Sequence, residues 1–458
     1  MAVPMLAGTF AMNTYNFVDT WFVSKLGTVP LAAMGFTFPV VMLLRFIVSG
    51  IGTGVTTLTS HALGRRDRDG ASRFVTHGMI LIFMLSAILA VLGSLTIVPL
   101  FRRLGADETT LPYVATYMRI WYFGALFMAA PMMGNGILIS LNDSKTAGRV
   151  MMIGPVLNCI LDPIFIFGLF GLPALGIFGA ALATILAQAV QSVILFRILV
   201  SKYRMLVFRG FRFPDFGTSC VRIMDFAIPG SLSMMLMPIS AGIITALVSR
   251  HGTAAVAAIS AAGRIEMLAF VIPMALGMSL TPFVSQNYGA GRMHRIYDAK
   301  KYSTRFAFFY GAFISVVFFI AAPVMAAIFT KDPRVEEIFI LYVRTISFGY
   351  GMMEIHRYSG FFLTGIHRPM LATAVNAVRV VALLIPLSFL GNKLYGILGI
   401  FGGRLLTDIA AGCIGLLWVT RLLGNMKEIE PGTDGIRING AGDGEGEIST
   451  CRRSTSEE

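Results

Sequence analysis

The chain has 458 residues, of which 56% are hydrophobic and only 13% are charged, and its mean hydropathy is +0.75. In soluble domains roughly a quarter of the residues are charged, so this composition excludes an ordinary soluble protein and indicates a polytopic membrane protein. The net charge of +13 would suggest a nucleic-acid partner in a soluble chain. Here the basic residues cluster in the loops between apolar stretches, and we expect no such partner.

Apolar stretches of about 20 residues, enough to cross a bilayer core of roughly 30 Å as a helix, occur twelve times in the sequence. Their polarity does not alternate, which argues against a membrane β-barrel. The first stretch lacks a basic flank and a cleavage site, so we expect a retained span rather than a signal peptide. The expected spans are residues 2–23, 34–60, 75–100, 112–140, 150–170, 176–198, 224–248, 256–286, 304–328, 337–364, 370–390 and 396–420.

The basic residues predict the orientation of the chain in the membrane. Eighteen lie in the loops after even-numbered spans and in the segment that joins the halves, whereas seven lie on the other side. By the positive-inside rule, the even loops and both termini are cytoplasmic. We therefore expect a multi-pass protein of the cell (inner or plasma) membrane.

The sequence repeats itself at a nearly constant spacing. Residues 23–33 return as residues 248–258, 225 residues later, and residues 175–184 return as residues 398–407, shifted by 223. The chain is thus predicted to be all-α, with twelve transmembrane helices in two parallel six-helix repeats. The expected parts are a first bundle at 1–200, a cytoplasmic linker at 201–222, a second bundle at 223–424 and a disordered cytoplasmic tail at 425–458.

Two acids inside the expected spans occur in the first half alone. At the repeat spacing Asp19 falls opposite Ile244, and Asp162 falls opposite Ile385. A charged side chain at mid-bilayer costs about 2.5–3.5 kcal/mol on insertion scales, so intramembrane acids are functional candidates. Because apolar surroundings favour the neutral form of a carboxyl group, and because carboxylate oxygens also bind hard cations, either H⁺ or Na⁺ fits as the ion bound at Asp19 and Asp162.

Other polar residues of the first half are expected to converge with these acids. Tyr15 and Asn158 lie four residues before Asp19 and Asp162, and therefore on the same helix faces. Asn135, Thr184 or Gln188 alone could equally serve as a polar contact that holds two helices together. The candidates are Asn158 and Thr184 at the ion site, and Tyr15, Tyr117, Asn135 and Gln188 in a substrate cavity.

The second half carries charges of its own in apolar context. Arg404 and Asp408, four residues apart, are expected to neutralise each other. Glu266 has no such helical partner and is a secondary candidate for coupling or substrate binding. Arg45, in the second span, is interpreted as an anchor.

Six motifs occur in order along residues 1–425, at residues 16–27, 31–35, 142–146, 158–168, 176–184 and 285–291. Together they resemble the multidrug and toxic compound extrusion (MATE) family. The resemblance implies a V-shaped pair of six-helix bundles that exports organic, often cationic compounds by alternating access, in exchange for protons or sodium ions. It further implies that Asp19, Asp162, Tyr15, Tyr117, Asn158 and Thr184 bind ion or substrate.

Other functions are weighed against this one. A flippase of lipid-linked saccharides is the nearest alternative, since the wider superfamily shares the fold, but the first-half cavity residues are acidic and neutral. An integral membrane enzyme would need clustered catalytic residues, and the six histidines are scattered. No phosphate-binding loop of the Gly-x4-Gly-Lys-Ser/Thr type is present, so a gradient rather than ATP is expected to supply the drive. We expect neither a cofactor nor a structural metal. The expected partners are small organic molecules and the lipid bilayer, and the protein is expected to be a monomer.

Overall fold

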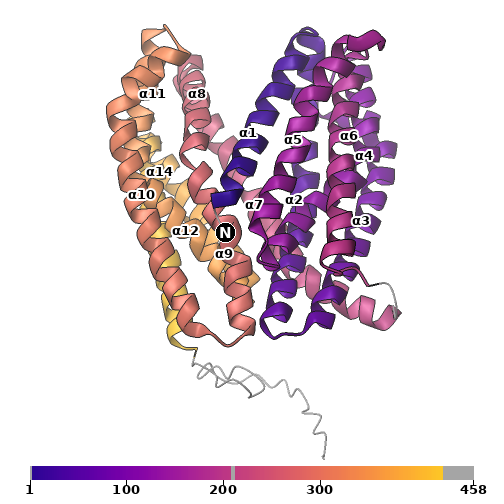
Figure 1. Ribbon diagram of the computed structural model, residues 1–458. Coiled ribbons are helices and arrows are strands. Elements are labelled where there is room, and N and C mark those ends of the chain that lie inside the picture. The colour runs from indigo at the N-terminus through magenta and orange to yellow at the C-terminus, as the bar shows by residue number, and fades with distance from the viewer. Residues whose placement is uncertain (1–2, 208–211, 427–458) are drawn as a thin grey trace, which may run out of the picture.

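The computed structural model describes residues 3–207 and 212–426, and these residues form two bundles of helices whose ribbons diverge in a V (Figure 1). The first bundle contains α1 (Val3–Ser24), α2 (Thr28–Gly64), α3 (Arg68–Arg103), α4 (Leu111–Ser140), α5 (Ser144–Phe167) and α6 (Gly176–Arg197). The second contains α7 (Phe213–Val248), α8 (Thr253–Ala269), α9 (Val271–Gly289), α10 (Met293–Phe329), α11 (Pro333–Ile346), α12 (Tyr350–Gly365), α13 (Pro369–Ala377) and α14 (Ile385–Gly424).

The two bundles repeat one backbone plan. Gly27, before α2, has φ 113° and ψ −179°, and Gly252, at the matching place before α8, has φ 99° and ψ 169°. Both conformations lie in a region that favours glycine. The repeated Val-Ser…Gly-Thr sequence is therefore the same turn, built twice.

The expected spans correspond to helices, with three differences in detail. Within the described residues, nine helices are long and apolar enough to cross a membrane, or ten when the bent pair α8 and α9 counts as one span. Residues 369–424 form two passes, because the backbone leaves the helical region at Tyr395 and Gly396 and Gly399 then packs against Gly391. The third difference is α7, which begins at Phe213, inside the expected linker and before the expected start of its span at residue 224. Apart from Asn425 and Met426, the expected tail lies outside the described residues.

A proline explains the bend between α8 and α9. The two helices meet at Phe270 at an angle of 55°. Pro273 has no N–H to donate to the carbonyl of Ala269, four residues earlier, and its ring crowds that carbonyl. The freed carbonyl oxygen instead accepts a hydrogen bond of 2.8 Å from the hydroxyl of Tyr310 on α10. A neighbouring helix thus satisfies the broken ladder, as a backbone group in a membrane requires.

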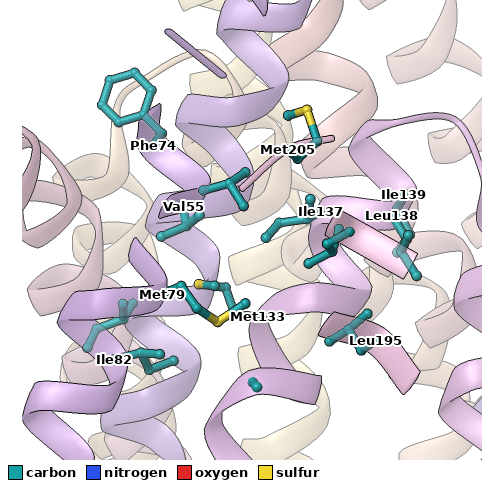
Figure 2. Close-up of a cluster of buried hydrophobic side chains, with 14 of the residues drawn as sticks. Val55, Phe74, Met79, Ile82, Met133, Ile137, Leu138, Ile139, Leu195 and Met205 are labelled. Carbon is teal, nitrogen blue, oxygen red and sulfur yellow. The ribbon is translucent and has the colours of Figure 1, made fainter. Parts of the chain in front are cut away.

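Interlocking apolar side chains fill the first bundle. Val55 of α2, Met79 of α3, Met133 of α4 and Leu195 of α6 belong to one buried cluster (Figure 2). Since lipid tails are as apolar as these side chains, close packing rather than exclusion from lipid holds the helices together.

The bundles join along one stretch of α2, which we call the seam: residues 46–64 of α2 against α7 and α9. Ser231 of α7 donates a hydrogen bond of 3.1 Å to the carbonyl of Phe46, and Ser285 of α9 donates one of 2.7 Å to the carbonyl of Thr57. A Cβ atom added to Gly64 would lie 2.0 Å from the carbonyl oxygen of Gln286. The seam lies toward the end of the molecule at which α2, α9 and α14 finish. We call this the closed end, because the ribbons of the two bundles spread apart away from it (Figure 1).

The connection between the bundles is held at this same end. Asp143 caps α5 by accepting a hydrogen bond from the amide of Thr146, and it also binds the ammonium group of Lys202 at 2.7 Å and the hydroxyl of Tyr203. Partial burial opposes the ionised form, but the hydrogen bonds from Lys202, Thr146 and Tyr203 outweigh it and lower the pKa of Asp143. The start of the connection is thereby fixed to the first bundle.

Close helix packing in the second bundle predicts the effect of a single methyl group. A Cβ atom at Gly311 of α10 would lie 2.3 Å from the Cα atom of Gly351 on α12, whereas a Cβ atom at Gly360 of α12 would meet open space. We expect Gly311→Ala to destabilise the protein by about 1–3 kcal/mol, since the backbones must separate. Gly360→Ala, the matched control, should leave stability unchanged or raise it slightly through helix propensity. Thermal unfolding in detergent checks both; equal melting temperatures for the two variants would contradict the packing.

Candidate functional site

The two acids singled out by the sequence lie in the interior of the first bundle. Asp19 is on α1 and Asp162 is on α5, and these two helices pack against each other. Asp162 is fully buried and Asp19 is 7% exposed. The carboxyl groups are near enough for the charge of Asp19 to act on Asp162. Two acids from distant parts of the chain thus share one site.

Two polar residues connect Asp162 to α6. The amide nitrogen of Asn158 donates to Oδ1 of Asp162 and to Oγ1 of Thr184, each at 3.1 Å. The Thr184 hydroxyl in turn donates to the carbonyl of Ala180 at 3.1 Å. The spacing of four residues between Asn158 and Asp162 places both on one face of α5, as the sequence predicts.

Two buried tyrosines and an arginine surround Asp19. Tyr15 and Tyr117 are each less than a tenth exposed, and both experience the charges of Asp19 and Asp162. The positive charge of Arg45 on α2 acts on both Tyr15 and Asp19. Arg45, interpreted from the sequence as an anchor, lies in this site instead. Its signal was a lone charge in the middle of an apolar span.

The other two candidates are only partly buried, and none of the contacts described for the two acids involves them. Gln188 lies beside Gly154, which precedes Asp162 by eight residues, or about 12 Å of helix. Its neighbour Gln191, a buried polar residue that the sequence analysis passed over, donates to the carbonyl of Val150 at 2.9 Å. Asn135 has a buried Oδ1 with no hydrogen-bond partner in the described part of the chain.

Several oxygens at the acid site have unused hydrogen-bonding capacity. Oδ1 of Asp19, Oδ2 of Asp162 and Oδ1 of Asn158 are buried, and none has a hydrogen-bond partner among the described residues. Buried polar atoms in proteins are nearly always partnered. Carboxylate, amide and hydroxyl oxygens are the ligands that hard cations prefer, and the carboxylates equally accept protons. The residues present therefore fit a proton or a sodium ion.

Comparison with known proteins identifies the family. The family model described as MatE matches the chain twice, over residues 4–164 and 229–390, so the two matches begin 225 residues apart, like the repeat in the sequence. The chain belongs to the MATE family. It is accordingly a multi-pass membrane protein and an efflux transporter of small molecules rather than an enzyme.

Individual MATE relatives extend over nearly the whole chain. A protein of Shewanella oneidensis named FAD transporter is 34% identical over 412 residues, which is 90% of this chain and 91% of its own. The multidrug export protein MepA of Staphylococcus aureus is 26% identical over 434 residues, 91% of this chain and 92% of its own.

Solved structures agree with the two-bundle fold. The Vibrio cholerae MATE transporter VcmN in its bent form superimposes with a TM-score of 0.87 at 30% identity, over 92% of this chain and 95% of that one. A multidrug resistance MATE family transporter described in an outward-facing conformation gives a TM-score of 0.87 at 26% identity, over 93% and 94%. The expected pair of parallel six-helix bundles is thus confirmed.

The second bundle of this MATE protein pairs its buried charges with one another. Glu266 of α8 accepts a hydrogen bond from the guanidinium group of Arg404 on α14 and another, at 3.1 Å, from the hydroxyl of Tyr342 on α11. Asp408 binds Arg379 at 2.7 Å, whereas its distance to Arg404 is 3.9 Å. The expected partnership of Arg404 with Asp408 is therefore secondary. Glu266, which the sequence left without a partner, has one from another helix.

This pairing predicts how the second bundle responds to the loss of one charge. We expect Arg404→Met to destabilise the protein by about 3–5 kcal/mol, because Glu266 would remain buried without its counter-charge. The double variant Glu266→Gln, Arg404→Met removes both charges and should recover most of the stability lost in Arg404→Met. Melting temperatures of the single and double variants in detergent check the coupling. Additive losses would show that the two residues do not depend on each other.

Proposed function

We propose that this MATE transporter is a secondary active antiporter, which exports amphipathic organic compounds in exchange for H⁺ or Na⁺ bound at Asp19 and Asp162. The observation that carries the proposal is the pair of buried carboxyl groups whose outer oxygens have no partner among the described residues. Asn158 and Thr184 hold one of these groups in place, and Tyr15 and Tyr117 line the site.

The chemistry of the site favours exchange. Two ionised carboxylates close together in apolar surroundings repel each other and lack hydration, and a bound H⁺ or Na⁺ relieves both costs. A cationic substrate relieves the same costs, so ion and substrate compete for one site. That competition is the physical basis of antiport, since either binding event excludes the other.

The ion gradient supplies the energy. One charge moving across the membrane contributes about 2.3 kcal/mol per 100 mV, before any concentration term. Because the loops at the closed end are rich in arginine and lysine, the positive-inside rule assigns this end to the cytoplasm. In this orientation the bundles close toward the cytoplasm and spread toward the outside, which is the arrangement for releasing substrate and taking up the ion.

Transport by acid variants tests the proposal. In proteoliposomes loaded with ethidium, with proton and sodium gradients imposed separately, we expect one gradient to drive efflux by the unaltered protein. Asp19→Asn and Asp162→Asn should each lower gradient-driven efflux at least tenfold, because an amide cannot bind the proton and carries no charge for Na⁺. Asp107→Asn is the control, since Asp107 is exposed in the loop before α4. Coupled efflux that survives in both site variants would refute the assignment.

A second candidate substrate is a flavin nucleotide. The relative of 34% identity is named FAD transporter, and Arg45 places a permanent positive charge beside Asp19. The two phosphate groups of FAD are ionised at neutral pH, so its export is favoured by a membrane potential that is negative inside. For two charges this drive amounts to about 4.6 kcal/mol per 100 mV.

Arg45 variants separate the two substrate classes. We expect Arg45→Gln to reduce FAD efflux from proteoliposomes at least tenfold while ethidium efflux persists or rises, because the anion loses its counter-charge. Arg45→Lys, which keeps the charge, should retain part of the FAD efflux. A potassium diffusion potential, negative inside, should accelerate FAD export by the unaltered protein. Equal loss of both substrates in Arg45→Gln would contradict a role in selecting the anion.

A further inference from the structure

Two histidines from different bundles face each other where the seam reaches the closed end. His61 is in the last turn of α2, and His367 follows α12. Their ring centroids are 4.4 Å apart with an angle of 50° between the planes. The pair is therefore a direct contact between side chains of the two bundles.

Aromatic rings from two further helices enclose this pair. The ring of Tyr288 on α9 lies 5.8 Å from that of His61 and 5.7 Å from that of His367. Phe226 of α7 packs edge-on against His367 at 5.2 Å. Both histidine rings are thus held in a largely apolar cage.

The backbone around the pair leaves little room for adjustment. A Cβ atom added to Gly289 of α9 would lie 2.2 Å from the carbonyl oxygen of His61. His367 has φ 63°, a left-handed conformation that side-chain-bearing residues adopt at a cost. Nδ1 of His61 is buried without a hydrogen-bond partner in the described residues, and Nε2 of His367 is 3.4 Å from Oγ of Ser285. The rings cannot move apart unless the helices do.

The charged neighbours of the cage are both cationic. Arg65, just after α2, acts on His61, and Arg368, just before α13, acts on Tyr288. Tyr288 itself is the remaining titratable group of the cage. Burial, and then the neighbouring His61, lower the pKa of His367 to about 3. Burial and the positive charge of Arg65 favour neutral imidazoles while the bundles are in contact.

We infer that His61 and His367 form a proton-sensitive latch on the cytoplasmic side, which holds the bundles together while both rings are neutral and releases them when the rings take up protons. The inference rests on the cytoplasmic orientation proposed above. The latch lies at the closed end, and neither histidine is proposed to bind the coupling ion.

The linkage between proton binding and conformation gives the direction in which pH shifts the equilibrium between the closed and open states. The closed state binds fewer protons than an open state in which the histidines are hydrated and titrate near their ordinary pKa of about 6.5. Falling pH therefore favours the open state. For one ring, lowering the pH from 7.5 to 5.5 should raise the ratio of open to closed molecules about tenfold. An acidic cytoplasm would thus turn the transporter toward the cytoplasm.

The distance between the bundles at the closed end tests the latch. Spin labels at Asp69→Cys in α3 and Asp298→Cys in α10, both exposed at this end, would be measured by pulsed electron resonance on the full chain in nanodiscs, with the native cysteines replaced by alanine. We expect the ratio of the longer to the shorter distance to rise about tenfold between pH 7.5 and 5.5 for each histidine that takes up a proton. His61→Gln with His367→Gln, made in an Asp19→Asn, Asp162→Asn background so that the acid site does not titrate, should abolish this response. His367→Lys should favour the longer distance at both pH values.

Controls separate the latch from the acid site and from misfolding. His251→Gln should keep the full response, because His251 lies beyond α7 near the other end, bound to Asn392 at 2.6 Å. Asp162→Asn should keep it too, so loss of transport coupling and loss of the latch are distinguishable. A pH response that persists in the double glutamine variant, or a lysine variant that stays closed at both pH values, would overturn the inference. The closed distance at pH 7.5 in the glutamine variants reports that they have folded.

Discussion

The structure depends on one constraint: a charge buried between membrane helices needs a counter-charge or a bound ion. The two bundles meet this constraint differently. In the second, Asp408 pairs with Arg379 and Glu266 pairs with Arg404. In the first, the one hydrogen-bond partner of Asp162 among the described residues is the neutral Asn158, and the charge of Arg45 acts on Asp19. Paired charges are costly to separate, so the second bundle suits a fixed frame, while the acids of the first bundle suit the proposed exchange site.

A single helix, α2, runs from the acid site to the closed end and contributes residues to both. Arg45 stands beside Asp19, and His61 lies sixteen residues further on, about 24 Å along the helix. The seam occupies the stretch between them, where close backbone contact with α7 and α9 leaves α2 little freedom to bend. We therefore expect a change of charge near Arg45 to tilt α2 as one rigid helix and so to alter the contacts at the closed end. Rigid-body motion of packed helices is a common form of such coupling.

Local patterns in the sequence predicted what depends on local physics. The apolar stretches gave the spans, the four-residue spacing placed Asn158 beside Asp162, and the repeat identified the two bundles. Contacts between distant helices could not be read in this way. The partner of Glu266 is 138 residues away on α14, and His61 meets His367 across more than 300 residues. Pro273 signalled a break in its span, but the hydroxyl of Tyr310 that accommodates it follows only from packing.

The repeat and these contacts together show how the two halves of the chain differ. The duplicated turns at Gly27 and Gly252 keep one conformation, whereas Asp19 and Asp162 have isoleucines as their counterparts. Charge was nevertheless not excluded from the second bundle. It occurs on other helices, α8, α12 and α14, where the buried acids Glu266, Glu354 and Asp408 each meet an arginine. What distinguishes the halves is therefore the pairing of their buried acids, and an acid bound to arginine is a poor competitor for a proton or sodium ion. The same scaffold thus provides a frame in one half and the proposed exchange site in the other.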